Sequence, residues 1–110
     1  MDLAERIFTM TAKFPRDQNY VMSTQMQRGA NSVPSNVAEG HARFSTKEYL
    51  YQISVALGSI AESETLLTLC RRVSLLPDDE VASALRLADE VGKMLRGIQR
   101  GLNLKLTWAP

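Results

Sequence analysis

The chain has very little of what most active sites are built from. Of its 110 residues one is a cysteine, Cys70, and one is a histidine, His41. A single cysteine excludes a disulfide framework and a cysteine-based zinc site within one chain. A single histidine leaves little material for histidine-based catalysis, and neither a nucleophile elbow nor a phosphate-binding loop occurs. We therefore predict a protein that is not an enzyme and that requires no metal and no other cofactor.

The catalytic alternative is a hydrolase or nuclease that uses Glu39, His41 and Arg43. Such a site requires the three side chains to converge on one concave pocket beside a metal or a nucleophile. Glu39 and His41 are two positions apart, so on a helix their side chains point about 200° away from each other. We interpret His41 as a surface residue near a helix end.

Strand patterns, long apolar runs and a strong charge imbalance are also missing. Aromatic residues make up 6% of the chain and the formal net charge is +1. No apolar run approaches the roughly 18–20 residues of a membrane span, and Asp2 and Glu5 stand too early for a signal peptide. These absences predict one soluble, cytoplasmic domain over residues 1–110, without membrane contact.

What the sequence does contain is apolar residues that recur at intervals of three and four, which predicts an all-α protein. A first helix over Asp2 to Lys13 presents Leu3, Ile7 and Met10. The stretch FPRD then breaks the chain near Phe14 to Arg16, with Asp17 as the predicted N-cap of the next helix.

The third and fourth helices have clear starts. Ser45-Thr46-Lys47-Glu48 is a capping box, flanked by Phe44 and Tyr49 at the positions of a hydrophobic staple. A second break at LLPDDE, near Leu75 to Pro77, puts Pro77 and three acids at the start of the last helix. The apolar positions that follow the two starts are Leu50, Ile53, Leu57, Ile60 and Leu67, and then Val81, Leu85, Ala88, Val91, Leu95, Ile98 and Leu102.

The stretch from Asp17 to Gly40 contains Pro34 and still keeps a helical period. Two parallel stripes stay in phase across the proline, which a loop would have no reason to do. We predict one long helix that continues through Pro34 with a bend there, because proline removes the hydrogen bond to the carbonyl of Ala30. The apolar stripe contains Met22, Met26, Gly29, Ala30, Val33 and Val37.

The second stripe is polar and consists mostly of short side chains between two arginines. It could be a solvated flank, but short serine and asparagine side chains suit the close approach of another helix. We predict a partly buried polar network at a helix–helix or subunit contact, with Glu62 and Glu64 as possible partners of the arginines. The stripe comprises Gln25, Arg28, Ser32, Asn36, Glu39 and Arg43.

Basic residues are concentrated toward the C-terminus. From Val91 to Pro110 there are four cations and no acid, and Arg71 and Arg72 close the third helix. The helix dipole alone can favour such cations, but repetition in an oligomer would make them attractive to phosphates. The candidate nucleic-acid-binding residues are Arg71, Arg72, Arg86, Lys93, Arg96, Arg100 and Lys105.

Two long stretches of the chain carry a family resemblance. FPRDQNYVMSTQMQRGANSVPSNVAEGHARFSTKEY, followed by ALGSIAESETLL, resembles the small S23-type bacterial proteins encoded in intervening sequences of large-subunit ribosomal RNA genes. These are similar in turn to the accessory variability protein of diversity-generating retroelements. The matching motif residues are Phe14-Pro15, Gln25, Arg28, Ser32, Pro34, Ser35, Asn36, Ala38-Glu39-Gly40, Arg43, Ser45, Gly58-Ser59 and Glu62.

The resemblance implies an antiparallel four-helix bundle, no known catalytic activity and assembly into a ring-like homopentamer. The short connections between the predicted helices indicate that they run up-down-up-down. The first helix starts late compared with the family, so we predict a short first helix. The retroelement relatives bind nucleic acid and a reverse transcriptase through a basic outer surface. RNA or a reverse transcriptase-type protein is therefore the partner that it implies. This chain departs from the family pattern at Gln27, where an arginine is common, and at Gly29 and Asn31, which replace an alanine and an apolar residue. The alternative function is a structural scaffold for a protein partner, which would use the apolar rim and the Trp108 tail.

Overall fold

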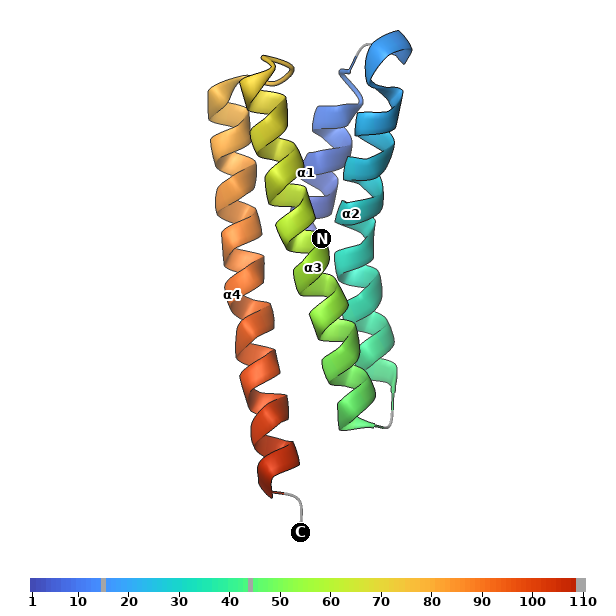
Figure 1. The fold of residues 1–110 in the computed structure, drawn as a ribbon, viewed down its shortest axis with the longest axis vertical. Coiled ribbons are helices and arrows are strands. Elements are labelled where there is room, and N and C mark those ends of the chain that lie inside the picture. The colour runs from blue at the N-terminus through green and yellow to red at the C-terminus, as the bar shows by residue number, and fades with distance from the viewer. Residues whose placement is uncertain (15, 44, 109–110) are drawn as a thin grey trace.

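Four helices make up the protein in this computed structural model (Figure 1). They are α1 (Asp2–Thr11), α2 (Arg16–Ala42), α3 (Thr46–Arg72) and α4 (Asp78–Trp108). The structure describes residues 1–14, 16–43 and 45–108, without the side chains at 16–20 and 108. No strand occurs in these ranges, so the predicted all-α class is confirmed.

The helices run alternately up and down, because short connections join each one to the next (Figure 1). α3 packs against both α2 and α4, and α1 packs against α2 and α4 on the opposite side. In the described residues α1 does not pack on α3, nor α2 on α4. The four helices therefore occupy the corners of a square, with α1 diagonally opposite α3.

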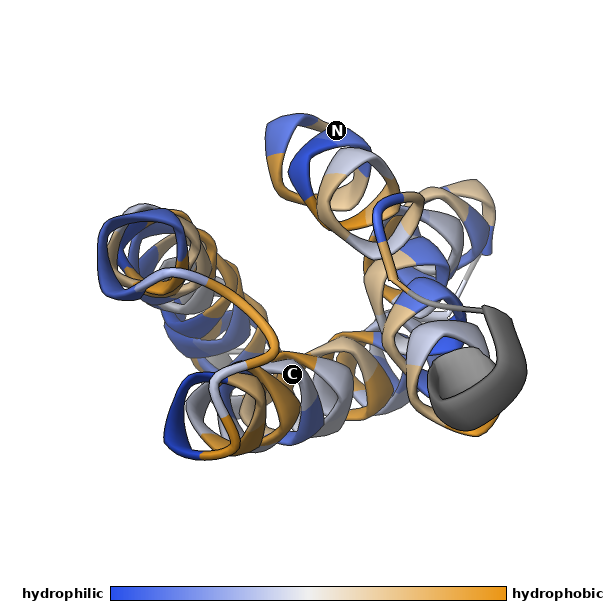
Figure 2. Cartoon of the chain, turned by 90° about the horizontal axis from the view of Figure 1, so that it is seen from above, coloured by the Kyte–Doolittle hydropathy of each residue, from blue (hydrophilic) through white to orange (hydrophobic). Residues whose placement is uncertain are grey.

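The core lies where the apolar stripes of the helices meet, as the spacing predicts. Seen end on, the helices turn hydrophilic segments outward (Figure 2). From α1 and α2 the core takes Leu3, Ile7, Met10, Met26, Ala30 and Val33. From α3 and α4 it takes Ile53, Ala56, Ile60, Leu67, Cys70, Val81, Ala84, Ala88, Leu95 and Leu102.

The helix ends agree with the sequence in one case and differ in another. The Ser45 hydroxyl accepts a hydrogen bond from the backbone N–H of Glu48 at 3.4 Å, so this half of the predicted capping box is present. Phe44, half of the predicted staple, lies outside the described residues. The prediction that Asp17 is an N-cap is wrong, because α2 begins at Arg16 and Asp17 lies inside its first turn.

Helix α2 runs without a break through Pro34, which confirms the continuity predicted from its two stripes. The side chain of Asn36 donates to the carbonyl oxygen of Ser32 at 2.7 Å and to the Ser32 hydroxyl at 2.8 Å. These two bonds add local support to the helix one turn from the missing proline N–H. The bend at Pro34 stays a prediction.

The shortness of α1 shapes one half of the molecule. α1 has 10 residues, whereas α2 and α3 have 27 each and α4 has 31. At 1.5 Å per residue α1 covers about 15 Å of the roughly 40 Å length of α2. It lies beside the half of the bundle that holds the α3–α4 turn, and the N-terminus is found about midway along the molecule (Figure 1). The other half lacks its fourth helix.

By length and composition alone, helix α3 is long and apolar enough to cross a membrane, and it is the one described helix of which this holds. It also packs between α2 and α4 with Ile53, Ile60 and Leu67 buried. The core helix of a bundle meets the same criterion, so this is weak evidence for a membrane span.

Two glycines on the same pair of helices give a test of the packing. A methyl group added at Gly40 would lie 2.8 Å from Cδ1 of Tyr49 and 2.9 Å from Cβ of Gln52, whereas one added at Gly58 would meet nothing within 4 Å. We expect Gly40→Ala to lower the free energy of unfolding by about 1–2 kcal/mol through overpacking. Gly58→Ala should raise it by about 0.5–1 kcal/mol through helix propensity. Urea unfolding followed by circular dichroism measures both, and equal stabilities would contradict the α2–α3 packing described here.

Candidate functional site

The predicted cations are all exposed, and the structure places them in separate groups. Four lie on α4 at spacings that keep them within about 80° of one another around the helix axis. Arg71 and Arg72 form the last turn of α3. Lys105 lies on α4 but about 140° around the axis from Arg100. We call the first group, Arg86, Lys93, Arg96 and Arg100, the α4 basic face.

One acid lies within the α4 basic face. The ammonium group of Lys93 is 3.1 Å from a carboxylate oxygen of Asp89, one turn earlier on the helix. Both side chains are more than half exposed, so this pair contributes little to stability. Arg86, Arg96 and Arg100 belong to none of the ion pairs among the described residues. The face therefore keeps a net positive charge.

Glycines lie beside the two arginines at the lower end of this face. A methyl group added at Gly92 would lie 3.3 Å from an Nη atom of Arg96, and one at Gly97 would lie 3.8 Å from an Nη atom of Arg100. Each guanidinium thus lies back along the helix, over a position that has no side chain. Both guanidinium groups therefore lie close to the surface of the helix.

The seven cations do not form a single patch within one chain. Arg72 ends α3 at the end of the bundle where α4 begins, and Arg96 lies 18 residues into α4. The separation along the axis is therefore about 27 Å. One subunit presents the α4 basic face as its main cationic surface, with the end of α3 as a second, smaller one.

The predicted polar stripe on α2 meets α3 at its centre. The Ser59 hydroxyl donates to the Ser32 hydroxyl at 2.8 Å, and Asn36 donates to the same oxygen. Ser32, Ser59 and Asn36 are all half-buried. The predicted close approach of another helix is confirmed, and that helix is α3 of the same chain.

The ends of the stripe behave differently from its centre. Gln25, Arg28, Glu39 and Arg43 are exposed. The expectation that the arginines pair with Glu62 or Glu64 is wrong for the described residues. A guanidinium nitrogen of Arg43 lies 3.4 Å from a carboxylate oxygen of Glu39, four residues earlier in the chain. No ion pair joins Arg28 to α3 in the described part of the chain. Glu62 is exposed and Glu64 half-buried, so water can solvate both carboxylates without a partner from α2.

Two departures from the family pattern have structural counterparts. The side-chain amide of Gln27 donates to the Thr11 hydroxyl at 2.8 Å, so it ties α2 to the end of α1. Gly29 is buried, and a methyl group added there would lie 3.1 Å from the Ser63 hydroxyl. Ser63 is buried as well, without a hydrogen-bond partner among the described residues. Gly29 therefore makes room for Ser63 at the α2–α3 contact.

The catalytic alternative lacks the geometry that it requires. His41 packs edge to face on Tyr49, with ring centroids 6.0 Å apart, and lines an apolar groove that contains neither Glu39 nor Arg43. Arg43 lines a different hollow with Lys47 and Tyr51. Among the described residues no three His, Cys, Asp or Glu side chains gather to hold a metal ion.

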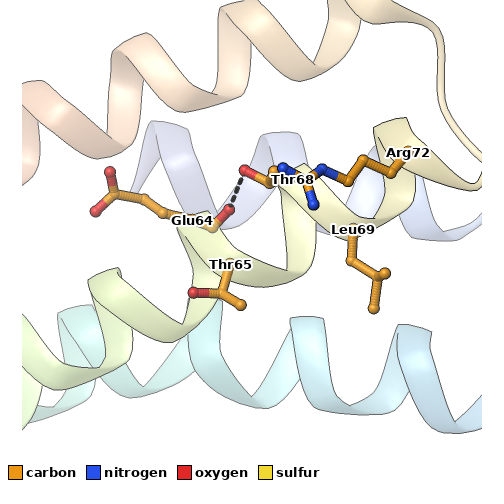
Figure 3. A pocket seen from close by; sticks show the side chains of 5 residues that line it. All are labelled: Glu64, Thr65, Thr68, Leu69 and Arg72. Atoms are coloured by element: carbon orange, nitrogen blue, oxygen red, sulfur yellow. Dashed lines mark hydrogen bonds between the residues drawn. The ribbon is translucent and has the colours of Figure 1, made fainter.

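A hollow of about 430 Å³ on the outside of α3 is no better suited to chemistry (Figure 3). It is lined by Glu64, Thr65, Thr68, Leu69 and Arg72. The hydroxyls of Thr65 and Thr68 donate to helix carbonyls one turn earlier, at 3.0 and 2.9 Å. These donors are already used, and the hollow offers only one charge of each sign.

His41 lines an apolar groove that we did not predict from the sequence. It has a volume of about 460 Å³ and lies between α2 and α4, below the N-terminus of α1. Met94 at its edge is 67% exposed. The signal was present in the sequence, because a first helix of about ten residues cannot cover a second helix of more than twenty.

Comparison with known proteins gives the family. The model of the 23S rRNA-intervening sequence proteins matches residues 1–97, so this chain belongs to that family. Among solved structures, the chain is similar to a protein of unknown function from the S23 ribosomal protein family of Bacteroides thetaiotaomicron. The TM-score is 0.81 at 26% identity, over 89% of this chain and 92% of the other. A search of curated proteins finds no match.

The reactivity of the Cys70 thiol tests whether this residue is part of the packed core. It is buried, its sulfur lies 3.6 Å from that of Met26, and burial raises the pKa of its thiol above the ordinary value of 9.0. Since the thiolate is the reactive form, we expect labelling by a disulfide reagent at pH 8 to be at least about a hundredfold slower than in urea. The same raised pKa predicts that stability falls as pH rises above 9, because only the unfolded thiol ionises there. Rapid labelling of the native protein would contradict this assignment.

Proposed function

We propose that this chain is a non-catalytic, self-associating cytoplasmic protein that binds structured RNA through the α4 basic face. The observation that carries the proposal is the α4 basic face itself. It presents four exposed cations on one side of one helix, with Asp89 among them and Glu90 about 40° from Arg86 around the axis, so the cations outnumber the acids two to one. Such a surface attracts phosphates without reading bases, so the binding should be largely independent of sequence.

The family description supports RNA as the class of ligand, since it names the 23S rRNA intervening sequence. The position of two arginines of this face supports it too. Arg96 and Arg100 lie close to the helix surface beside Gly92 and Gly97, where a phosphate backbone can approach both. Arginine suits this role because its planar group can donate two hydrogen bonds to one phosphate.

Self-association is the second part of the proposal. One chain has a formal charge of only +1, so it attracts a polyanion weakly. Several copies of the α4 basic face are needed to contact many phosphates together. Large apolar side chains that are more than half exposed on this small domain support a contact between copies. Those on the described helices and turns are Val21, Tyr51, Val73, Met94 and Leu104.

The stoichiometry comes from the resemblance, which implies a homopentamer. The exposed ends of the polar stripe, Gln25, Arg28, Glu39 and Arg43, are the proposed polar part of the contact, and Glu62 is exposed on the adjacent helix. In a ring, Arg71, Arg72 and Lys105 could add to the α4 basic face of the same or a neighbouring subunit. A reverse transcriptase-type protein remains the second partner that the resemblance implies.

The alternative is a scaffold that binds a protein partner and has no nucleic-acid role. It is favoured by the apolar groove between α2 and α4, which a phosphate backbone would not fill. The two functions differ in their response to salt, because apolar contacts are far less sensitive to it than phosphate contacts.

Light scattering coupled to size exclusion tests the assembly. We expect a mass of about five times the 12.3 kDa of one chain at micromolar concentration. Arg28→Glu should reduce that mass, because it reverses one charge in the proposed contact. Ser54→Glu, a change at another exposed helical position, is the control. A wild-type mass near 12.3 kDa would refute self-association.

A gel-shift titration with folded ribosomal RNA fragments tests the RNA function. We expect a shift at low salt whose affinity falls about 10³–10⁵-fold between 50 and 200 mM salt, if some 6–10 phosphates are contacted. The Arg96→Ala/Arg100→Ala variant should lose most of the affinity.

The matched control is Lys13→Ala/Lys47→Ala, which removes the same charge from exposed positions outside the α4 basic face. Lys13 pairs with Glu80, but its ammonium group is well exposed and 3.4 Å from the carboxylate, so the pair contributes little to stability. If both variants weaken binding equally, the effect is one of net charge and not of the α4 basic face. If the wild type gives no shift at low salt, the scaffold function is favoured.

A further inference from the structure

A hollow on the outside of the bundle, where α2 ends and α3 begins, is not used by the proposed RNA function. Its volume is about 330 Å³, and it is lined by Arg43, Lys47, Glu48, Tyr51 and Gln52. Arg43 follows the end of α2, and the other four residues belong to the first two turns of α3. Tyr51 is 66% exposed and has the most exposed aromatic side chain in the described part of the chain. We call this feature the Tyr51 hollow.

The aromatic ring of the Tyr51 hollow stands on a rigid element. α2 and α3 approach closely beside it, because a methyl group added at Gly40 would lie 2.9 Å from Cβ of Gln52. Ile53, two residues after Tyr51, is fully buried in the core. Since these two side chains are about 200° apart around the helix axis, the buried one holds the other toward solvent. A tyrosine has only two side-chain torsions, so little freedom is lost when a ligand stacks on it.

Two cations stand beside the ring. Lys47 lies one turn before Tyr51, within about 40° of it around the axis of α3. Arg43 reaches the hollow from the end of α2, and one of its guanidinium nitrogens lies 3.4 Å from Glu39. This pair is exposed and weak, and the guanidinium has further N–H groups to donate. Because Glu39 and Glu48 balance the two cations, any attraction of phosphate here is local.

Three of the lining side chains are free to bind a ligand. Lys47, Tyr51 and Gln52 make no hydrogen bond or ion pair with the residues that the structure describes. They offer an ammonium group, a phenol hydroxyl and an amide. The hollow of Figure 3 differs in this respect, because Thr65 and Thr68 already donate to helix carbonyls there.

This set of groups matches the parts of a nucleotide. A base can stack on the ring of Tyr51, and its phosphates can accept hydrogen bonds from the two cations. The amide of Gln52 can both donate to and accept from a base edge. In a duplex the bases are paired and stacked on one another, so only an unpaired base can lie on a protein ring. The α4 basic face cannot serve this purpose, since residues 78–107 of α4 include no aromatic residue.

We propose that the Tyr51 hollow binds one unpaired nucleotide of an RNA strand. The base stacks on Tyr51, and two successive phosphates of the strand contact Lys47 and Arg43. This site goes beyond the proposed function, because it distinguishes single strands and loops from the duplex that the α4 basic face can hold. Arg43 is the last residue of the polar stripe, so the hollow lies at the rim of the proposed contact between copies, where interfaces stay accessible to solvent.

Isothermal titration of the full chain with unlabelled pentauridine, a short strand that does not pair, tests the site. At 50 mM salt we expect Tyr51→Ala to weaken binding at least about fivefold, because one stacked base is lost. Tyr51→Phe keeps the ring and should stay within about twofold of the wild type. The matched control is Phe8→Ala, which removes an aromatic side chain, 44% exposed, from a hollow without lysine or arginine. Thermal unfolding should show that all three variants are folded.

Salt and a free nucleotide give two further measurements. With only one or two phosphates in contact, the affinity for pentauridine should fall about three- to sevenfold between 50 and 200 mM salt. The α4 basic face of several copies predicts a far steeper dependence. Uridine monophosphate has one phosphate and cannot contact both cations as two successive phosphates do. We expect it to bind at least about tenfold more weakly than pentauridine.

Four outcomes would overturn the proposal. The first is no saturable binding of pentauridine up to about 1 mM. The second is equal binding by the wild type and Tyr51→Ala, or equal weakening by Tyr51→Ala and Phe8→Ala. The third is equal affinity for uridine monophosphate, which would exclude a strand. The fourth is a lower oligomer mass for Tyr51→Ala, which would assign the ring to a contact between copies.

The two RNA proposals fail separately. The Arg96→Ala/Arg100→Ala variant leaves the Tyr51 hollow intact and should bind pentauridine within about twofold of the wild type. Tyr51→Ala leaves the α4 basic face intact and should shift an RNA duplex in a gel as the wild type does. Loss of pentauridine binding in the arginine variant alone would place the strand on the α4 basic face and contradict the site at Tyr51.

Discussion

The close approach of α2 and α3 is the contact on which the rest of the bundle depends. Gly29 lets Ser63 come within 3.1 Å of where a methyl group would stand, and Ser59 of α3 donates to Ser32 of α2, which also accepts from Asn36 of its own helix. Because these side chains are short, α2 and α3 can pack at a small separation along their contact. α4 then packs on the other side of α3, and α1 closes the square between α2 and α4. An uninterrupted α2 is required for this arrangement, which is why Pro34 has to be accommodated within the helix.

Most of the fold could be predicted from the sequence, because its strongest signals are local. The three-four spacing of Leu3, Ile7 and Met10, or of Val81, Leu85 and Ala88, determines which face of a helix is buried before any partner is known. Ser45 capping Glu48 is equally local. The start of α2 was misplaced at Asp17 for the same reason: the residue type favours an N-cap, but the helix begins one residue earlier.

The candidate site was less predictable, because it depends on how helices are placed relative to one another. The spacing correctly grouped Lys93, Arg96 and Arg100, which lie on one helix, but it could not show that Arg72 lies about 27 Å away along the bundle. It suggested ion pairs between α2 and α3, whereas Arg43 pairs with the nearer Glu39. The groove beside Met94 follows from a difference in helix lengths, a property of the whole bundle and of no single motif.

The two buried sulfur atoms at the centre of the bundle have a consequence for oxidative damage. The Cys70 thiol and the Met26 thioether lie 3.6 Å apart, and neither residue has any surface in contact with solvent. Oxidants reach exposed sulfur first, so Met1 and Met94 would be converted to sulfoxides while the folded protein still shields this pair. A polar, enlarged sulfoxide at Met26 would not fit where the helices meet. Oxidised Met26 would therefore be a chemical record that a molecule had once opened, and such a molecule would not pack its core in the same way again.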